Sequence, residues 1–242
     1  MDSQRKERIE LVATTIRRRW GVKALDTLGT ASPAAHVKST SSGFAVLDKA
    51  LGIGGIPQSC ITEFVGNPTS GIVTIALKII ASAQANSSMA IYLDLSESLD
   101  ADYADRCGVD LNTLLLIRPQ PPERSLELLR DLVEKKAASV VVFDSLASLS
   151  QPRHKLTRAL QLISRTLTES GCALIFLNPS PNQMLAQAAV RLSVQRKEWL
   201  KRHGDVYGYL SQITITKNKF ALSGQKLVVS LDFEEVVLGD AA

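Results

Sequence analysis

Residues 66–73 read Gly66-Asn67-Pro68-Thr69-Ser70-Gly71-Ile72-Val73, and their two glycines have the spacing of a Walker A phosphate-binding loop. Residues 60–65, just before this loop, are branched and aromatic, which predicts a strand. After the loop, Ile72, Ile75 and Ile79 recur at helical spacing, which predicts a helix. A Walker A loop requires this order of strand, turn and helix. An ordinary turn between a strand and a helix in another α/β protein has the same local pattern.

The loop lacks the two side chains that carry the chemistry of the motif. Ile72 stands where the motif has the lysine that neutralises the β- and γ-phosphates, and Val73 stands where it has the hydroxyl that binds Mg²⁺. An aliphatic side chain can do neither. The sequence therefore predicts a phosphate-loop scaffold without its phosphate-binding groups.

A second motif is Val140-Val141-Val142-Phe143-Asp144-Ser145. Four apolar residues that end in Asp144 are typical of a Walker B strand, whose carboxylate holds Mg²⁺ in nucleotide-hydrolysing P-loop proteins. Such an aspartate can also cap the next helix. This motif comes after the loop with the Gly66–Gly71 spacing, and the two motifs together favour a P-loop fold.

The remaining pattern predicts an α/β protein with a mostly parallel sheet. Short apolar strands alternate with helices, which is typical of a parallel sheet covered by helices on both faces. The last two predicted strands alternate in polarity, like an antiparallel pair at the sheet edge. The strands are expected at residues 60–65, 90–94, 140–144, 173–177, 212–217 and 226–233, and the helices at 44–51, from 72, at 124–136 and at 156–169.

The chain is expected to consist of a leading helix with a linker, residues 1–41, and a core domain, residues 42–242. The leading helix is predicted at residues 3–20, where an apolar stripe of Ile9, Val12, Ile16 and Trp20 stands among charged residues. Residues 27–42 are rich in Ala, Ser, Thr and Gly, which is typical of a linker.

Composition narrows the class of protein. No apolar run reaches the roughly 18–20 residues of a membrane span, and no apolar signal core follows the N-terminus. The three cysteines are widely spaced among apolar residues, as in a reduced, cytoplasmic protein. Three scattered histidines give no metal-binding spacing, so no metal is expected. Aromatic content of 5% argues against a broad platform for stacking bases.

Positive charge gathers in two places, residues 1–23 and residues 191–203. Basic patches suit nucleic acid or an acidic partner surface, whereas a solvated helix face is the more common explanation for a single run. The candidate residues are Arg17, Arg18, Arg19, Arg191, Arg196, Lys197, Lys201 and Arg202. For the second run the ordinary alternative is a solvated edge of a helix and loop.

Together these segments resemble the core of the RecA/RadA recombinase family. Residues 42–57 (Ser-Gly-Phe-Ala-Val-Leu-Asp-Lys-Ala-Leu-Gly-Ile-Gly-Gly-Ile-Pro) carry the most specific likeness, and Lys217-Asn218-Lys219 is a second close signature. Further matches lie at residues 66–71, 94–110, 141–145, 174–178 and 190–192. The leading helix is similar to the family's N-terminal polymerisation arm. The likeness implies that this arm and Lys217 and Lys219 contact a neighbouring subunit.

The resemblance also shows where the nucleotide site has changed. Asp100 and Tyr103 match the family's adenine-contacting positions, whereas Ser96 stands at the position of the water-activating glutamate and Glu97 is displaced by one. The family's DNA-binding loops are shortened after Asn178. Loss of one preorganised stabilising group typically costs about 3–4 kcal/mol in the transition state, and three are altered here. We therefore expect no useful ATP hydrolysis, weak or absent ATP binding, and no cofactor.

Among RecA-related groups, the chain is most similar to the ImuA group, whose members have degenerate ATP motifs. This likeness implies a catalytically inactive adaptor in DNA-damage repair or error-prone lesion bypass. Such a protein is expected to bind RecA, to cap filament ends and to work beside a Y-family polymerase homologue. Two alternatives stay open. One is a RecA paralogue that binds DNA directly in recombinational repair, and the other is a weak ATPase with a rearranged site.

Overall fold

The computed structural model describes residues 3–21, 37–149, 152–179, 184–203 and 205–232. The chain divides into two units, residues 1–36 and residues 37–242. Residues 27–36 of the predicted linker lie outside the described residues. Among the described residues, no helix combines the length and the apolar character needed to cross a lipid bilayer.

The first unit contains the helix α1 (Ser3–Trp20), which confirms the predicted leading helix. Its last turn carries Arg17, Arg18 and Arg19, and cations there interact favourably with the negative end of the helix dipole. Gly21, with φ of +90°, donates its N–H to the carbonyl of Arg17 and ends the helix. In this unit, helix α1 exposes a set of large apolar side chains, namely Ile9, Leu11, Val12 and Trp20. A helix that exposes such a stripe has an apolar surface to offer a partner.

The second unit is built on two sheets. The small one pairs β1 (Ser39–Thr40) with β2 (Ile56–Pro57). The large one has eight strands in the order β10-β9-β8-β3-β7-β6-β4-β5. Its strands are β3 (Cys60–Val65), β4 (Ala90–Asp94), β5 (Leu114–Ile117), β6 (Val140–Asp144), β7 (Ala173–Asn178), β8 (Val190–Arg202), β9 (Asp205–Asn218) and β10 (Lys226–Asp232).

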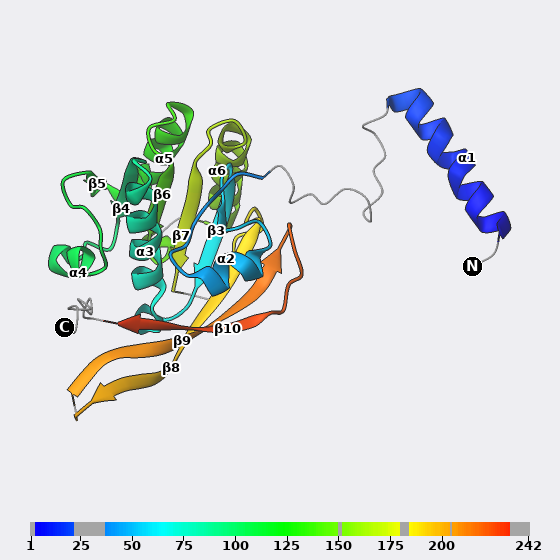
Figure 1. Cartoon of the computed structure of the whole chain (residues 1–242). Coiled ribbons are helices and arrows are strands. Elements are labelled where there is room, and N and C mark those ends of the chain that lie inside the picture. Colours follow the sequence, from blue (N-terminus) through cyan, green and yellow to red (C-terminus); the bar gives the residue numbers. More distant parts are fainter. Residues whose placement is uncertain (1–2, 22–36, 150–151, 180–183, 204, 233–242) are drawn as a thin grey trace. The chain divides into compact units, whose positions relative to one another are not determined.

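The large sheet is mostly parallel, as predicted. Strands β8, β3, β7, β6, β4 and β5 run parallel to one another, and β9 and β10 add an antiparallel edge beside β8. The helices that accompany it are α2 (Ala45–Leu51), α3 (Ile72–Ala85), α4 (Ala101–Arg106), α5 (Ser125–Glu134) and α6 (Arg153–Leu167), with short 3-10 turns η3 (Pro68–Ser70), η4 (Pro122–Arg124) and η5 (Leu146–Ser148). Figure 1 shows α2 and α3 in front of the sheet.

Successive strand residues point to opposite faces, so the sheet separates two hydrophobic cores. One core joins α2 and α3 to residues such as Phe64, Tyr92 and Val142. The other joins α5 and α6 to residues such as Phe143 and Phe176, whose ring centroids lie 5.0 Å apart. Strands that are buried on both faces read as continuous apolar runs, which is why their positions could be predicted.

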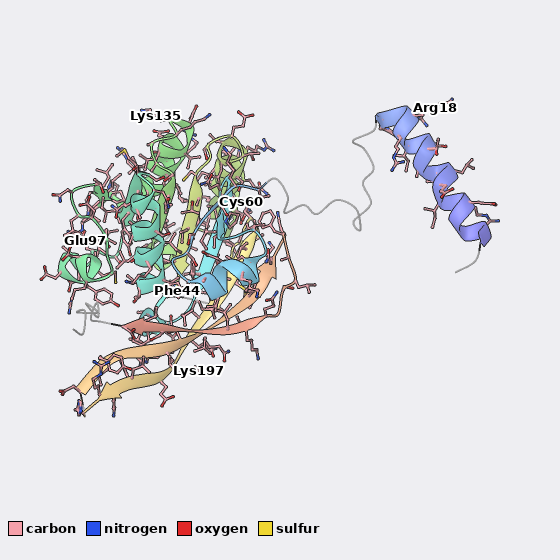
Figure 2. The ribbon with its side chains drawn as sticks, in the orientation of Figure 1. Arg18, Phe44, Cys60, Glu97, Lys135 and Lys197 are labelled. Atoms are coloured by element: carbon pink, nitrogen blue, oxygen red, sulfur yellow. The ribbon has the colours of Figure 1, made fainter. Side chains whose placement is uncertain are left out.

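For residues 191–203, the alternative interpretation as a solvated edge of a helix and loop was wrong. This run is not the edge of a helix and loop, because β8 extends from Val190 to Arg202 and pairs with β9 along its length. The far ends of the two strands project beyond the helices as a hairpin (Figure 1), and Lys197 lies on it (Figure 2). The sequence reading also missed α4 and β5, which are six and four residues long.

Candidate functional site

The phosphate-loop sequence lies between a strand and a helix, as its motif requires. Strand β3 ends at Val65, η3 forms the turn, and α3 begins at Ile72. The N–H of Gly66 donates to the carbonyl of Asn178 on β7, at 3.1 Å, which ties the loop to the neighbouring strand. A Cβ on Gly66 would lie 2.5 Å from the carbonyl oxygen of Val194, so only glycine allows this approach to β8.

The two side chains that replace the motif's lysine and hydroxyl belong to the hydrophobic core. Ile72 is 3% exposed and is part of the core cluster between α3 and the sheet. Val73 is partly buried and packs against the same cluster. These side chains offer neither positive charge for a phosphate nor oxygen for Mg²⁺, so they do not fit Mg·ATP in the manner of a Walker loop.

The antiparallel edge of the sheet closes against the end of the loop. Gly71 has φ of +102°, and a Cβ there would lie 2.5 Å from Leu231 Cδ1 and 3.2 Å from both Ser211 Oγ and Tyr209 Cε2. The buried hydroxyl of Ser211 donates to the carbonyl of Ser70 at 2.7 Å. Side chains from β9 and β10 therefore occupy the space beside the start of α3.

Three hydroxyl side chains, those of Thr74, Tyr103 and Tyr209, form hydrogen bonds beside the first turn of α3. Thr74 Oγ1 is 2.7 Å from the hydroxyl of Tyr103 and 3.1 Å from that of Tyr209. Burial raises the pKa of both tyrosines, so they remain neutral. Tyr103 packs against the core, and the guanidinium of Arg106 lies 5.8 Å from the centre of its ring. Asp100 caps α4 by accepting from the N–H of Tyr103 at 3.1 Å. These contacts favour a packing role for Tyr103 over the adenine contact that the resemblance implies.

Two carboxylates, Asp94 and Asp144, stand opposite each other at the ends of β4 and β6. Asp144 accepts a 2.7 Å hydrogen bond from the buried hydroxyl of Tyr92. Burial, more than any other factor, raises the pKa of Asp144, and the nearby charge of Asp94 raises it further. Arg118 binds the fully buried Asp94 through both Nε and Nη2 at 3.0 Å. The sequence reading missed this ion pair.

The residues at the predicted position of the water-activating glutamate are held by their own neighbours. Ser96 Oγ donates to Asp94 Oδ1 at 3.3 Å. Glu97 has φ of +52° and accepts from Nε2 of Gln120 at 2.8 Å. Within the part of the chain that the structure describes, no group of three or more His, Cys, Asp or Glu side chains could hold a metal ion.

Comparison with known proteins decides the family. The profile of the RecA N-terminal domain matches residues 7–237. The chain belongs to the RecA family. It is 31% identical to Protein RecA of Staphylococcus carnosus over an alignment covering 91% of this chain and 71% of that protein. It is 32% identical to Protein RecA of Staphylococcus epidermidis, with 91% and 72% covered.

Two of the predicted basic residues of this RecA-family chain, Arg191 and Lys217, form hydrogen bonds with other parts of the same chain. Arg191 Nε lies 2.7 Å from Oε2 of Glu63, which is fully buried, and Arg191 Nη2 donates to the carbonyl of Leu185 at 2.6 Å. These contacts engage the guanidinium of Arg191 within the protein, and its role in binding DNA or an acidic partner stays a prediction. Lys217 Nζ donates to the carbonyl of Ala186 at 2.9 Å, and partial burial, followed by the charges of Arg191 and Lys219, lowers the pKa of Lys217. Lys219 is exposed.

Glu63 itself was missed, although one carboxylate in the apolar strand β3 was a signal. It accepts from Nδ2 of Asn178 at 2.8 Å and from the N–H of Leu185 at 3.1 Å, in addition to Arg191. A buried carboxylate costs a large desolvation free energy unless it is paired and hydrogen-bonded. This network therefore holds β7, β8 and residue 185 together at one end of the sheet.

The other basic residues of the second run lie on the β8–β9 hairpin. The guanidinium of Arg196 lies 4.2 Å from the ring centre of Trp199, which in turn meets Tyr209 edge-on at 5.6 Å. Arg202 lies 5.1 Å over the ring of Tyr207. Lys197 and Lys201 are exposed.

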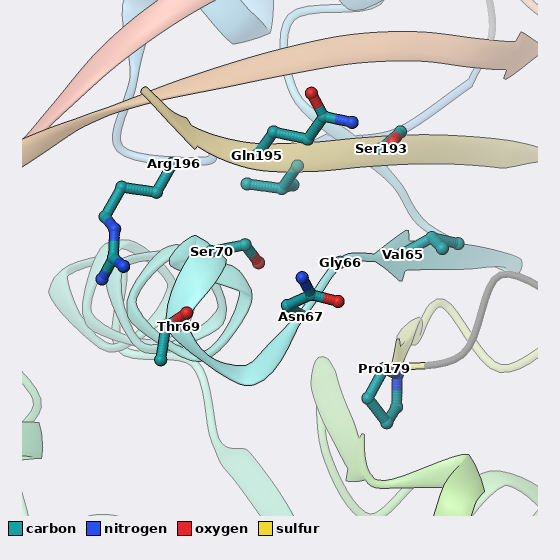
Figure 3. A pocket seen from close by; sticks show the side chains of 10 residues that line it. Val65, Gly66, Asn67, Thr69, Ser70, Pro179, Ser193, Gln195 and Arg196 are labelled. Carbon is teal, nitrogen blue, oxygen red and sulfur yellow. The ribbon is translucent and has the colours of Figure 1, made fainter. Parts of the chain in front are cut away.

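A cavity of about 420 Å³ separates this hairpin from the phosphate-loop sequence. Figure 3 shows Asn67, Ser70, Gln195 and Arg196 around it. Hydroxyls, amides and Arg196 supply its polar groups, and no carboxylate lines it. Its lining is Val65, Gly66, Asn67, Thr69, Ser70, Pro179, Ser193, Val194, Gln195 and Arg196.

Proposed function

We propose that this RecA-family protein does not hydrolyse ATP and acts in DNA-damage repair by binding RecA. The observation that carries the proposal is the apolar packing at the start of α3, where the phosphate loop ends. Ile72 is committed to the core, and Leu231, Ser211 and Tyr209 crowd the glycine that precedes α3. A RecA fold whose loop lacks the phosphate-binding side chains, and whose α3 begins against β9 and β10, is suited to binding rather than catalysis.

The energetics of a triphosphate support the loss of hydrolysis. Phosphoryl transfer depends almost entirely on positioning and on neutralising charge. With Ile72 and Val73 in the loop, the phosphate charges would meet mainly backbone N–H groups. Removal of each stabilising group typically costs about 3–4 kcal/mol, so ATP binding is weak or absent and turnover is lost. The alternative of a weak ATPase with a rearranged site requires phosphate release that Asp144→Ala abolishes.

A nucleotide-binding measurement tests this part directly. A ligand present at 100 times its Kd stabilises the folded state by about 2.7 kcal/mol. We expect no change in unfolding free energy when ATPγS and Mg²⁺ are added in large excess. A stabilisation of that size, lost in Asp144→Ala, would overturn the proposal of a closed site.

The surfaces that remain are those expected to meet a neighbouring subunit. Helix α1 exposes Ile9, Val12 and Trp20, and the exposed Lys219 lies just beyond β9. Lys217 already donates to Ala186. Lys219 is therefore the better candidate for an intermolecular contact. A protein with these surfaces and a closed nucleotide face would bind a RecA filament end without extending it.

Co-sedimentation with RecA filaments tests this docking. RecA of the same organism is assembled on single-stranded DNA with ATPγS, and the chain is expected to sediment with it. Val12→Glu and Lys219→Glu should weaken capture. The matched controls Leu222→Glu and Lys226→Glu, which also alter exposed side chains, should not. Absence of wild-type capture, or equal losses in the controls, contradicts docking through these surfaces.

The likeness to the ImuA group extends the proposal to error-prone lesion bypass beside a Y-family polymerase homologue. The test is co-purification of the chain with the Y-family homologue of the same organism, with RecA absent and present. Failure to co-purify under both conditions removes this partner and leaves the RecA-binding proposal standing.

A second candidate function is direct DNA binding by the β8–β9 hairpin. Arg196 over Trp199 and Arg202 over Tyr207 combine positive charge with aromatic rings, which suits single-stranded nucleic acid. Fluorescence anisotropy across a salt series tests it, because phosphate contacts make affinity fall steeply as salt rises. Arg196→Ala should weaken binding, whereas Lys226→Ala on β10 serves as the control.

A further inference from the structure

A groove beside α6, distant in sequence from the phosphate loop, has no role in the function proposed above. It lies between the first turns of α6 and residues 184–187, the segment that leads into β8. Its lining combines aliphatic side chains with one arginine, and consists of Leu149, Arg153, Leu156, Thr157, Leu160, Met184, Leu185, Ala186 and Gln187.

The size of the groove indicates what it can hold. Its volume is about 60 Å³, well below the roughly 300–1,000 Å³ of sites for free small molecules. It therefore suits the end of one apolar side chain that belongs to a larger partner. Met184 is 45% exposed at its edge, so the groove opens to solvent.

A positively charged surface continues from the groove along α6. Arg153 and Thr157 line the groove and also belong to an open surface of α6, which His154, Arg158 and Gln161 complete. Lys155 lies on the same turn and is exposed. Residues 145–168 contain no Asp or Glu, and in the described part of the chain no carboxylate forms an ion pair with these cations.

The positive charges in the first turn of α6 are electrostatically unfavourable for the helix. The N-terminus of a helix carries partial positive charge, so cations in the first turn are unfavourable there. Here the first turn of α6 holds Arg153 and Lys155, contains no acidic residue, and has no side-chain cap. Sequences that break a local rule in this way tend to do so at functional sites. An acidic partner would remove the repulsion.

The wall opposite α6 is held by the buried ion-pair network. Glu63 accepts from the N–H of Leu185, Arg191 donates to the carbonyl of Leu185, and Lys217 donates to the carbonyl of Ala186. A wall fixed in this way loses little conformational entropy when a partner binds. The same contacts engage the guanidinium of Arg191 and the amine of the partly buried Lys217.

We propose that this groove and the basic face of α6 form a docking site for an acidic segment of a partner protein that carries apolar anchor residues. The basic residues bind the carboxylates, and the aliphatic groove takes one apolar anchor. A nucleic acid fits less well, because the lining holds no aromatic side chain on which a base could stack. Phosphates would also leave the aliphatic floor without a partner.

Fluorescence polarisation of labelled peptides with the full chain tests the proposal. The probes contain glutamate with leucine and phenylalanine, in one set at helical spacing and in another set alternating. One control set replaces glutamate with lysine, and a second replaces the apolar residues with serine. We expect the acidic, apolar probes to bind and both control sets to lose at least about tenfold in affinity, equivalent to about 1.4 kcal/mol.

Variants locate the site. Arg153→Glu, Arg158→Glu and Met184→Asp should each weaken binding about tenfold. Arg165→Glu, an exposed charge reversal near the other end of α6, should leave it unchanged. Circular dichroism confirms that each variant is folded.

Three outcomes overturn the proposal. The first is that no probe binds. The second is that the Arg165 variant loses as much affinity as the others, which indicates an unspecific charge effect. The third is that the serine-substituted acidic probes, or single-stranded DNA, bind as well as the apolar probes and depend on Arg153, which indicates a site for polyanions.

Discussion

The buried ion pair between Glu63 and Arg191 supports a quantitative prediction about stability. Arg191→Met keeps a flexible aliphatic stem but removes the guanidinium and its positive charge. Glu63 is then left 0% exposed without its cation. Breaking a buried pair by removing one partner typically costs about 3–5 kcal/mol, because the remaining charge is uncompensated.

The contacts around Glu63 narrow this range. Its carboxylate keeps the hydrogen bonds from Asn178 at 2.8 Å and from the N–H of Leu185 at 3.1 Å. In contrast, the carbonyl of Leu185 loses the donor that Arg191 supplied at 2.6 Å. We therefore expect the lower end of the range, about 3 kcal/mol of unfolding free energy.

Replacement of Arg191 and replacement of Glu63 should lower the unfolding free energy by different amounts. Arg191 is 15% exposed, so its guanidinium can reach water when Glu63 is neutralised, whereas Glu63 cannot reach water when Arg191 is removed. Glu63→Gln should therefore destabilise the protein less than Arg191→Met does. The matched control is Arg130→Met. Arg130 lies 3.6 Å from Asp131, and both side chains are about half exposed. Its loss should cost less than about 1 kcal/mol.

Urea unfolding followed by circular dichroism measures these differences by linear extrapolation. The reasoning is refuted if Arg191→Met costs no more than Arg130→Met, because water would then have to reach Glu63 in the folded protein. A cost of about 3 kcal/mol together with unchanged DNA affinity supports the conclusion that Arg191 is an internal residue.

Three further predictions concern the degenerate site. Burial raises the pKa of Asp144 above its ordinary 3.8, so the folded state binds this proton more tightly than the unfolded state does. The resulting stabilisation is complete below pH 3.8 and is lost as the pH rises through the folded-state pKa. Asp144→Asn should remove this loss, and identical pH profiles of unfolding free energy in the two proteins would contradict the assignment. Gly71→Ala should cost about 1–3 kcal/mol of unfolding free energy because of its left-handed backbone, and crowding by Leu231, Ser211 and Tyr209 should add to that cost. The control Gly224→Ala, at φ of +88° with nothing within 4 Å of its Cβ, should lack the cost of crowding. Equal shifts in melting temperature would contradict tight packing around Gly71. Restoring the motif with Ile72→Lys and Val73→Thr should not restore phosphate release, and should destabilise the fold by more than the roughly 1–3 kcal/mol typical of a buried neutral polar group, as chemical unfolding would measure.

The strands that the sequence predicted correctly are those buried on both faces. Residues 140–144 are four apolar side chains and an aspartate, and such a run reads as a strand without knowledge of its neighbours. Strand β8 escaped prediction because its outer half, from Arg196 to Arg202, is polar and exposed. Pairing with β9 stabilises that half, and the apolar pattern of the segment does not reveal this pairing.

The site shows the same division. The absence of a lysine at residue 72 and of a hydroxyl at residue 73 is evident from the sequence, because each side chain's chemistry is local. The ion pair of Arg191 was not predicted because its partner Glu63 stands 128 residues earlier. The contact of Tyr209 with Thr74 spans 135 residues, and no spacing rule predicts it.

The sequence by itself determined that a strand, a glycine-rich turn and a helix form a phosphate-type loop without phosphate-binding groups, because side-chain chemistry and periodicity are properties of short segments. Only the tertiary structure decided which side chains pack against the end of that loop and which charges remain at the surface. Those outcomes depend on contacts between distant segments, where a buried charge must find a partner that offsets its lost hydration. Glu63 found such a partner in Arg191, and the charges of Arg153 and Arg158 on α6 remained at the surface.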